Sequence, residues 1–115
     1  MAQRKMVRVV AGDRAVRRSL EFTLEAEGFD VKSHADMESA TTPPIVPVEC
    51  AIIDDDALQS GAEIELLQKI QAPVILLVDP LRPAVGVSAA RILLKPYIGL
   101  TLIESVVDLI NCTAS

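Results

Sequence analysis

The sequence has few of the residues that build metal centres, redox centres and hydrolytic sites. Its 115 residues include no tryptophan, one histidine and two cysteines. Cys50 and Cys112 lack the spacing of a metal-binding pair with each other or with His34, so we expect reduced thiols and no bound metal. No serine, histidine and aspartate stand in a relation that predicts a hydrolase. We therefore expect that the protein is not an enzyme.

The sequence also has fewer basic than acidic residues and no long apolar segment. Eleven lysines and arginines stand against sixteen aspartates and glutamates, which gives a net charge of −5. This balance argues against a nucleic-acid surface. No apolar run approaches the roughly 18 residues of a membrane span, and the start of the chain lacks a signal-type apolar stretch. We expect one cytoplasmic domain over residues 1–115, with neither nucleic acid nor membrane as a partner.

Five short apolar runs alternate with segments of helical periodicity. The runs are predicted as β-strands and cover residues 6–10, 29–33, 50–53, 73–78 and 91–94. Helices are predicted over residues 14–27, 61–70 and 98–111, with one or two helical turns at 36–40. Residues 79–90 contain two prolines and a glycine and are predicted as a loop. This order predicts an α/β fold with a parallel sheet and helices on both faces.

The third apolar run leads directly into three consecutive carboxylates, Asp54, Asp55 and Asp56. In an open parallel sheet, side chains just past the carboxyl end of a buried strand line the ligand crevice. The position therefore favours ion binding or phosphate transfer. The alternative interpretation is a solvated acidic turn.

Four motifs, taken in order, resemble the receiver domain of bacterial two-component response regulators. They are Val16-Arg17-Arg18-Ser19-Leu20 followed by Gly28-Phe29-Asp30-Val31, then Ala51-Ile52-Ile53-Asp54, Ala72-Pro73-Val74-Ile75, and Leu94-Lys95-Pro96-Tyr97. The resemblance covers essentially the whole chain and is nearest to receivers of the FixJ type. It implies a flavodoxin-like, doubly wound five-stranded parallel sheet in the order 2-1-3-4-5, here with the fourth helix shortened or lost. It also implies a cis peptide bond between Lys95 and Pro96, which would turn the lysine into the pocket.

The resemblance places the phosphoacceptor at Asp54 and its lysine partner at Lys95, but several other positions of the pocket differ. Family members carry an acidic pair that holds Mg²⁺ where this chain has Ala11 and Gly12. The remaining pocket positions are Asp13, Asp56 and Val78, and the last of these replaces a hydroxyl residue. The aromatic switch position is Ile92. We therefore expect neither bound Mg²⁺ nor another cofactor, because Mg²⁺ needs an oxygen shell anchored by carboxylates.

Two hypotheses follow for the function. The first is an atypical receiver that keeps the fold of a phosphorelay protein but signals through protein contacts. In this hypothesis, Asp54 and Lys95 form a structural ion pair at the edge of the sheet. The alternative is a stand-alone response regulator that accepts phosphate on Asp54 from a sensor histidine kinase. Protein partners, either the kinase or another signalling protein, are expected in both cases.

The last predicted helix is apolar over roughly 200° of its circumference, which exceeds the stripe that packing on a sheet requires. With the fourth helix missing, the surplus predicts an interface. We expect a homodimer through this helix and residues 79–90, with interface residues Leu102, Ile103, Val106, Leu109 and Ile110. The alternative is that the loop folds back and buries the helix within one chain.

Overall fold

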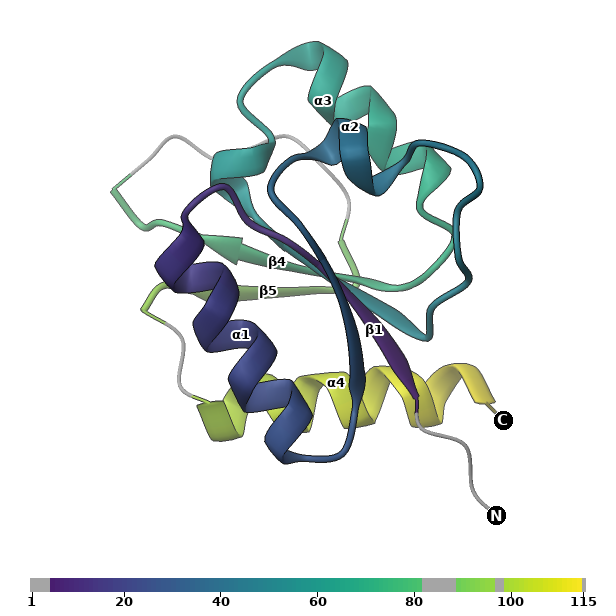
Figure 1. The fold of residues 1–115 in the computed structure, drawn as a ribbon. Coiled ribbons are helices and arrows are strands. Elements are labelled where there is room, and N and C mark those ends of the chain that lie inside the picture. Colours follow the sequence, from purple (N-terminus) through teal and green to yellow (C-terminus); the bar gives the residue numbers. More distant parts are fainter. Residues whose placement is uncertain (1–4, 82–88, 97–98, 115) are drawn as a thin grey trace.

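The computed structural model describes residues 5–81, 89–96 and 99–114 (Figure 1). Five parallel strands form one sheet in the order β2-β1-β3-β4-β5, as predicted. The strands are β1 (Met6–Val10), β2 (Asp30–His34), β3 (Cys50–Asp54), β4 (Val74–Val78) and β5 (Arg91–Leu94). The central strands β1, β3 and β4 are those with the most apolar sequences, and β2 lies at an edge, so this part of the prediction is also confirmed.

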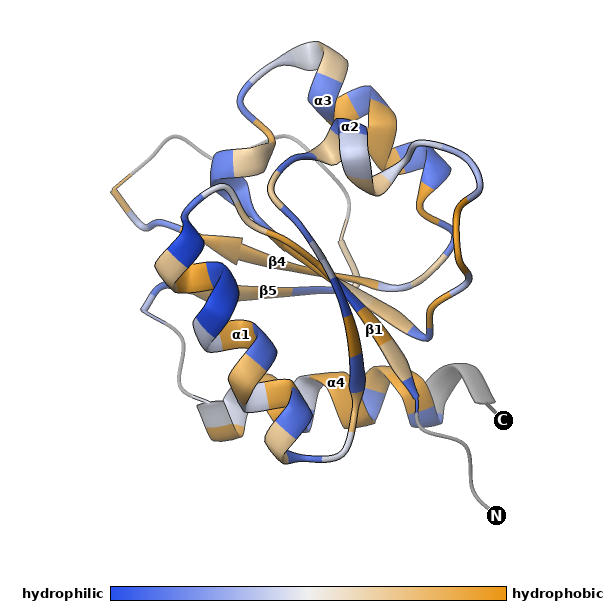
Figure 2. Ribbon diagram, in the orientation of Figure 1, coloured by the Kyte–Doolittle hydropathy of each residue, from blue (hydrophilic) through white to orange (hydrophobic). Residues whose placement is uncertain are grey.

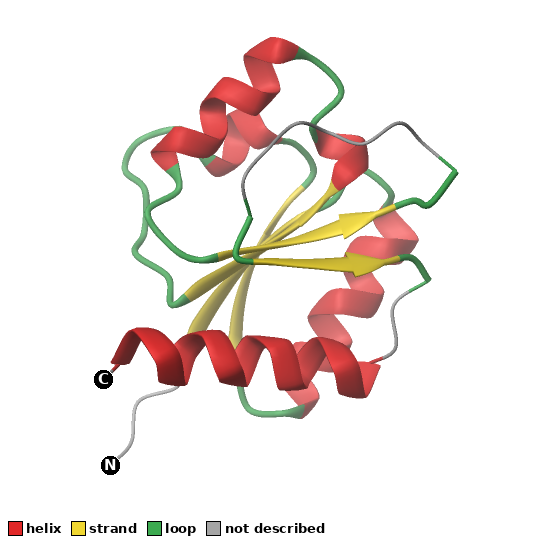
Figure 3. Cartoon of the chain, turned by 180° about the vertical axis from the view of Figure 1, so that it is seen from behind, coloured by secondary structure: helices red, strands yellow, loops and turns green. Residues whose placement is uncertain are grey.

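The helices cover both faces of the sheet (Figures 1 and 3). Helices α1 (Arg14–Ala26) and α4 (Gly99–Ala114) lie on one face. The short helices α2 (Met37–Ala40) and α3 (Gly61–Leu66) lie on the other, where the 3₁₀ turn η2 (Leu67–Lys69) continues α3. Another 3₁₀ turn, η1 (Asp55–Ala57), follows β3 directly. None of the helices in the described part of the chain is long and apolar enough to cross a membrane.

Each face of the sheet has its own apolar core, and Figure 2 shows the hydrophobic strands between them. Successive side chains of a strand point to opposite faces. In β3, Ile52 therefore packs with α1 and α4, while Ala51 and Ile53 pack with α2 and α3. Since both sides are covered, all five residues of β3 are buried, and Asp54 at its end is carried into the interior.

Small differences from the predicted boundaries have local causes. Strand β2 begins at Asp30, because the amide of Phe29 still bonds to the carbonyl of Leu24 in the turn after α1. The helix predicted over residues 61–70 tightens into the 3₁₀ turn η2 after Leu66. The loop predicted over residues 79–90 includes residues 82–88, which lie outside the described residues.

Helix α4 requires a correction to the predicted interface. Leu102, Val106 and Ile110 are buried in the core shared with α1 and the sheet, and Ile103 and Leu109 pack against that core. They face inward because α4 packs against both β3 and α1. The wide apolar stripe of the helix is therefore buried within the chain. Among the described side chains of α4, the large apolar ones that are exposed are Leu100 and Val107.

Candidate functional site

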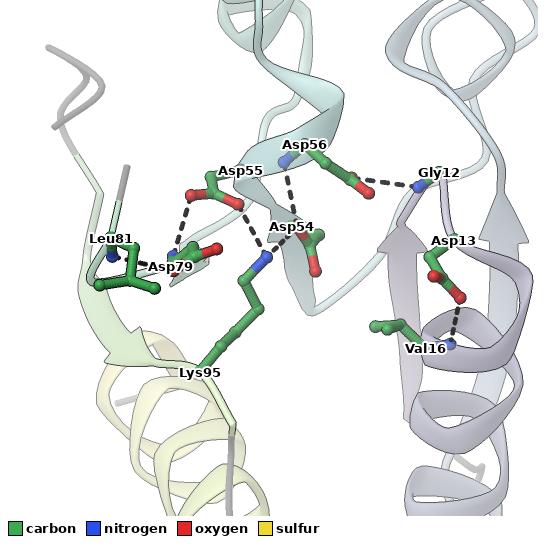
Figure 4. A network of polar contacts seen from close by, with 9 residues as sticks. All are labelled: Gly12, Asp13, Val16, Asp54, Asp55, Asp56, Asp79, Leu81 and Lys95. Carbon is green, nitrogen blue, oxygen red and sulfur yellow. Dashed lines mark hydrogen bonds and ion pairs between the residues drawn. The ribbon is translucent and has the colours of Figure 1, made fainter. Parts of the chain in front are cut away.

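The carboxyl ends of β3, β4 and β5 bring a network of charged residues together at one edge of the sheet (Figure 4). Asp54 ends β3, and Asp55 and Asp56 follow it in η1. Asp79 follows β4, and Lys95 follows β5. The parallel order of the strands therefore places these charged side chains around the end of β3, as the sequence predicted for Asp54 and Lys95.

Asp54 is held from two sides. Its Oδ1 accepts hydrogen bonds from Lys95 Nζ at 2.8 Å and from the backbone N–H of Asp56 at 3.0 Å. Only 2% of its side-chain surface is exposed. The Lys95–Pro96 peptide bond is cis, which confirms the prediction at this corner. The ion pair predicted between Asp54 and Lys95 is thus present, and it lies in the interior.

Asp55 is the second partner of Lys95, a contact that was not predicted from the sequence. Its Oδ1 accepts a hydrogen bond from Lys95 Nζ at 2.9 Å, and its Oδ2 accepts one from the backbone N–H of Asp79 at 2.9 Å. Its side chain is 1% exposed. The carboxylate therefore ties the residues that follow β4 to the residues that follow β3 (Figure 4).

The two buried carboxylates differ in proton affinity. Burial raises the pKa of Asp54, and the hydrogen bonds from Asp56 and Lys95 offset this effect only in part. Burial also acts to raise the pKa of Asp55, but the hydrogen bonds from the Asp79 amide and Lys95, together with an interaction with the Asp54 carboxyl group, hold it below its usual range. The pKa of Lys95 is raised: burial acts to lower it, but the bonds to both carboxylates outweigh that effect. Falling pH therefore protonates Asp54 before Asp55.

Asp56 and Asp13 do not join Lys95. Asp56 Oδ1 accepts a hydrogen bond from the backbone N–H of Gly12 at 3.2 Å, and a Cβ on Gly12 would lie 3.3 Å from Asp56 Oδ2. Asp13 caps helix α1, because its Oδ1 accepts from the amides of Ala15 and Val16 (Figure 4). Its carboxylate is therefore directed toward the first turn of the helix.

The residue after β1 is next to a positive charge. The carbonyl oxygen of Ala11 accepts a hydrogen bond from Arg17 Nη1 at 2.8 Å, and the carbonyl of Gly12 lies 3.5 Å from the same nitrogen. Arg17 comes from the first turns of α1. The guanidinium thus supplies positive charge at the end of β1.

A groove of about 780 Å³ runs beside the charged network. Helix α1 contributes Val16, Ser19 and Thr23, the residues after β4 contribute Asp79, Pro80 and Leu81, and Lys95, Pro96 and Gly99 complete its wall. Leu81 is exposed, as are Phe22 on α1 and Leu100 on α4.

The chain is similar in fold to solved receiver proteins and in sequence to a curated relative. No family model matches the chain. Full-length FixJ from B. japonicum superposes with a TM-score of 0.75 at 21% identity; the match covers 96% of this chain and 59% of FixJ. A response regulator receiver protein from Sinorhizobium medicae WSM419 gives a TM-score of 0.80 at 18% identity, covering 95% of this chain and 96% of that protein.

A curated relative decides the family. The transcriptional regulator protein FixT of Rhizobium meliloti (strain 1021) is 33% identical over an alignment 115 positions long, which covers 96% of this chain and 96% of FixT. The chain belongs to the response regulator receiver family. The resemblance noted in the sequence motifs is therefore confirmed.

Two further positions of this receiver lie around Lys95. The backbone carbonyl of Val78 accepts a hydrogen bond from the Lys95 amide at 2.8 Å, while the valine side chain packs against the core on the α2 and α3 face. Ile92 on β5 is exposed on that same side of the sheet, since its register partner Leu76 belongs to that core. Val78 thus holds the lysine through its backbone and brings no hydroxyl to the pocket.

Proposed function

We propose that this receiver is an atypical, cytoplasmic one that acts through protein contacts and does not turn over phosphate on Asp54. The observation that carries the proposal is the bond of Lys95 to two buried carboxylates at once. Asp54 is 2% exposed and already accepts two hydrogen bonds on Oδ1. In this proposal, Lys95 forms ion pairs with Asp54 and Asp55 that stabilise the ends of β3 and β5. The chain is then not an enzyme.

The donor set around Asp54 does not fit Mg²⁺. Ala11 and Gly12 have no side-chain oxygen, and Asp56 accepts a hydrogen bond from Gly12. The guanidinium of Arg17 bonds to the carbonyl of Ala11, which opposes the approach of a second cation. Among the described residues, no three histidine, cysteine, aspartate or glutamate side chains are grouped so that they could hold a metal ion. Phosphoryl transfer to a receiver depends on charge neutralisation by the metal, so we propose that no cofactor is used.

The alternative function is phosphate acceptance on Asp54 from a sensor histidine kinase. One observation favours it: Lys95 Nζ lies 2.8 Å from Asp54 Oδ1 at the end of β3, in the arrangement that the family resemblance implies. Both hypotheses therefore use the same pair, and they differ in whether the carboxylate reacts.

Intact-mass measurement after incubation with acetyl phosphate and Mg²⁺ separates the two. We expect the wild type to gain no phosphoryl group beyond the level of Asp54→Asn, because the groups that neutralise charge in the reaction are replaced. Stoichiometric modification of the wild type that disappears in Asp54→Asn would instead establish the alternative function.

A gain-of-function variant extends this test. The variant Ala11→Asp with Gly12→Asp should bind Mg²⁺, whereas the wild type should show no saturable binding by calorimetry. A side chain at position 12 requires the Asp56 carboxylate to shift by a few tenths of an ångström, because a Cβ would lie 3.3 Å from its Oδ2. Adding Asp56→Asn to the double variant should therefore ease the rearrangement. Equal Mg²⁺ affinity in the wild type and the double variant would contradict the argument from the donor set.

We also propose that partners, including a second copy of this chain, contact the groove between α1 and α4. The exposed Leu81 in the wall of the groove supports this surface, and Phe22 and Leu100 are exposed on the two helices that contribute to that wall. Sedimentation equilibrium at micromolar concentration should show a dimer that Leu100→Glu weakens by about tenfold or more. Val107→Glu, on another exposed position of α4, is the matched control. A wild-type monomer would exclude the second copy as the occupant.

A further inference from the structure

A second charged site lies around Arg8, on the face of the sheet that α2 and α3 cover. Arg8 is in the middle of β1 and projects toward the α2 and α3 face, the side to which its register partner Ala51 packs. It is only 3% exposed. Its Nη1 lies 2.9 Å from His34 Nε2, and its Nη2 donates a hydrogen bond to the carbonyl of Val46. An arginine in a basic N-terminal segment is thus a buried residue.

The two groups that bond to this guanidinium, the His34 ring and the Val46 carbonyl, are both uncharged. Arginine is only a donor, so His34 Nε2 must accept, and the ring is then neutral with its proton on Nδ1. Among the described residues, no carboxylate forms an ion pair or hydrogen bond with Arg8 in the structure. Burial lowers the pKa of the guanidinium, but it stays charged at neutral pH. A buried charge of this kind is costly without a counter-ion.

A pocket of about 230 Å³ opens beside Arg8. Its walls come from the loop before β3, the end of η2 and the residues just before β4, and they comprise Ile45, Val46, Pro47, Val48, Lys69, Ile70 and Gln71. Lys69 adds a second positive charge and Gln71 adds an amide, while no aspartate or glutamate lines the pocket. A local surplus of positive charge is unusual in a chain with a net charge of −5.

We propose that this pocket binds a small oxyanion, a carboxylate or a phosphate, as the counter-ion of Arg8. The planar guanidinium matches such oxygens in geometry, and Lys69 supplies the second charge. The volume is below the roughly 300–1,000 Å³ of sites for larger organic ligands, so the ligand is a small anion. The site shares no residue with the network around Asp54, and the proposal stands whether or not Asp54 accepts phosphate.

His34 is the only histidine in the sequence, so its ring protons are an unambiguous NMR reporter for the site. Burial lowers the pKa of His34, Arg8 and Lys32 act in the same direction, and Asp36 opposes them. An anion bound beside Arg8 should raise that pKa by about half a unit or more. The probes are inorganic phosphate and acetate, each titrated into the full chain against chloride at matched ionic strength.

We expect a saturable shift of the His34 signals at millimolar phosphate or acetate. Lys69→Gln should weaken the binding by about threefold or more, because it removes one of the two charges of the pocket. Lys32→Gln is the matched control: it removes a charge near His34 that does not line the pocket, and it should keep the anion response. Arg8→Met should abolish the response.

A response to phosphate and acetate alike identifies the shared oxyanion chemistry, and a response to one of them identifies the preferred class. The absence of saturation with both probes would overturn the proposal. So would an equal loss of response in Lys69→Gln and Lys32→Gln, because that result assigns the effect to overall charge. Circular dichroism of Arg8→Met checks its fold, and Lys69→Gln, at an exposed position, keeps the test decisive if Arg8→Met does not fold.

Discussion

Replacing Lys95 with methionine should lower the free energy of unfolding by about 3 kcal/mol, because it leaves buried carboxylates without their cation. The ammonium bonds to Asp54 at 2.8 Å and to Asp55 at 2.9 Å, and those side chains are 2% and 1% exposed. The side chain of Lys95 is 23% exposed, so we expect a loss of unfolding free energy at the lower end of the range for a broken buried ion pair. Urea unfolding followed by circular dichroism measures the change.

Arg91→Met, at the start of the strand β5 that Lys95 follows, is the matched control. Arg91 Nη2 lies 3.4 Å from Asp108 Oδ2, with side chains 44% and 60% exposed, so losing this pair should cost less than about 1 kcal/mol. Adding Asp54→Asn and Asp55→Asn to Lys95→Met should restore much of the stability, because amides need no cation. Equal effects of Lys95→Met and Arg91→Met would show that Lys95 does not neutralise the buried carboxylates.

The same variant should respond to pH in a defined direction. The pKa of Lys95 is raised, so its stabilisation is complete below the ordinary lysine value of about 10.4 and is lost as the pH rises through the raised value. The pKa of Asp55 is lowered, so its contribution is present above about 3.9 and is lost as the pH falls through the lowered value. Asp54 has a raised pKa, and its ionisation opposes folding. Removing Lys95 raises both carboxyl pKa values, so the deficit of Lys95→Met should shrink from neutral pH toward about pH 4.

Leu102→Ala should cost about 3 kcal/mol of stability, since it opens a cavity in the core between α4, α1 and the sheet. Leu102 is fully buried, although its helix position predicted an interface. The measurement is again the midpoint of urea unfolding. The dependence of the unfolding free energy on urea concentration should stay unchanged, which shows that unfolding still exposes the same surface.

Leu100→Ala provides the comparison within the same helix. Leu100 is 69% exposed, so the same substitution should change stability by no more than about 0.5 kcal/mol. The intrinsic helix preference of the two residues is the same in both variants and cancels. If Leu100→Ala proved as costly as Leu102→Ala, the orientation of α4 described above would be wrong.

The fold followed from the sequence because its central strands β1, β3 and β4 are largely buried and therefore form short apolar runs in the sequence. Cys50 to Ile53 shows this most clearly, as it is apolar throughout and ends in an abrupt run of acids. The orientation of α4 did not follow in the same way. A helix that is apolar over half its circumference can expose the surplus or bury it against a second helix, and only the position of α1 decides between them.

The charged site was predictable in part. The ion pair of Asp54 and Lys95 followed from the resemblance to receivers, but the partnership with Asp55 depends on the 3₁₀ turn after β3, which three consecutive aspartates do not specify. The burial of Arg8 was not predicted, although alternation along β1 places it on the face that carries Val10. That alternation was the signal that could have identified it as buried.

The contact between Gly12 and Asp56 bears on how this receiver could change over evolutionary time. A side chain at position 12 would begin 3.3 Å from the Asp56 carboxylate, and the Gly12 amide already bonds to that group. An acidic residue at position 12 would place like charges together without a cation between them. A single acidic substitution at position 12 is therefore disfavoured on its own, unless position 56 changes first. The order in which substitutions could introduce an acidic pair after β1 is constrained in the same way.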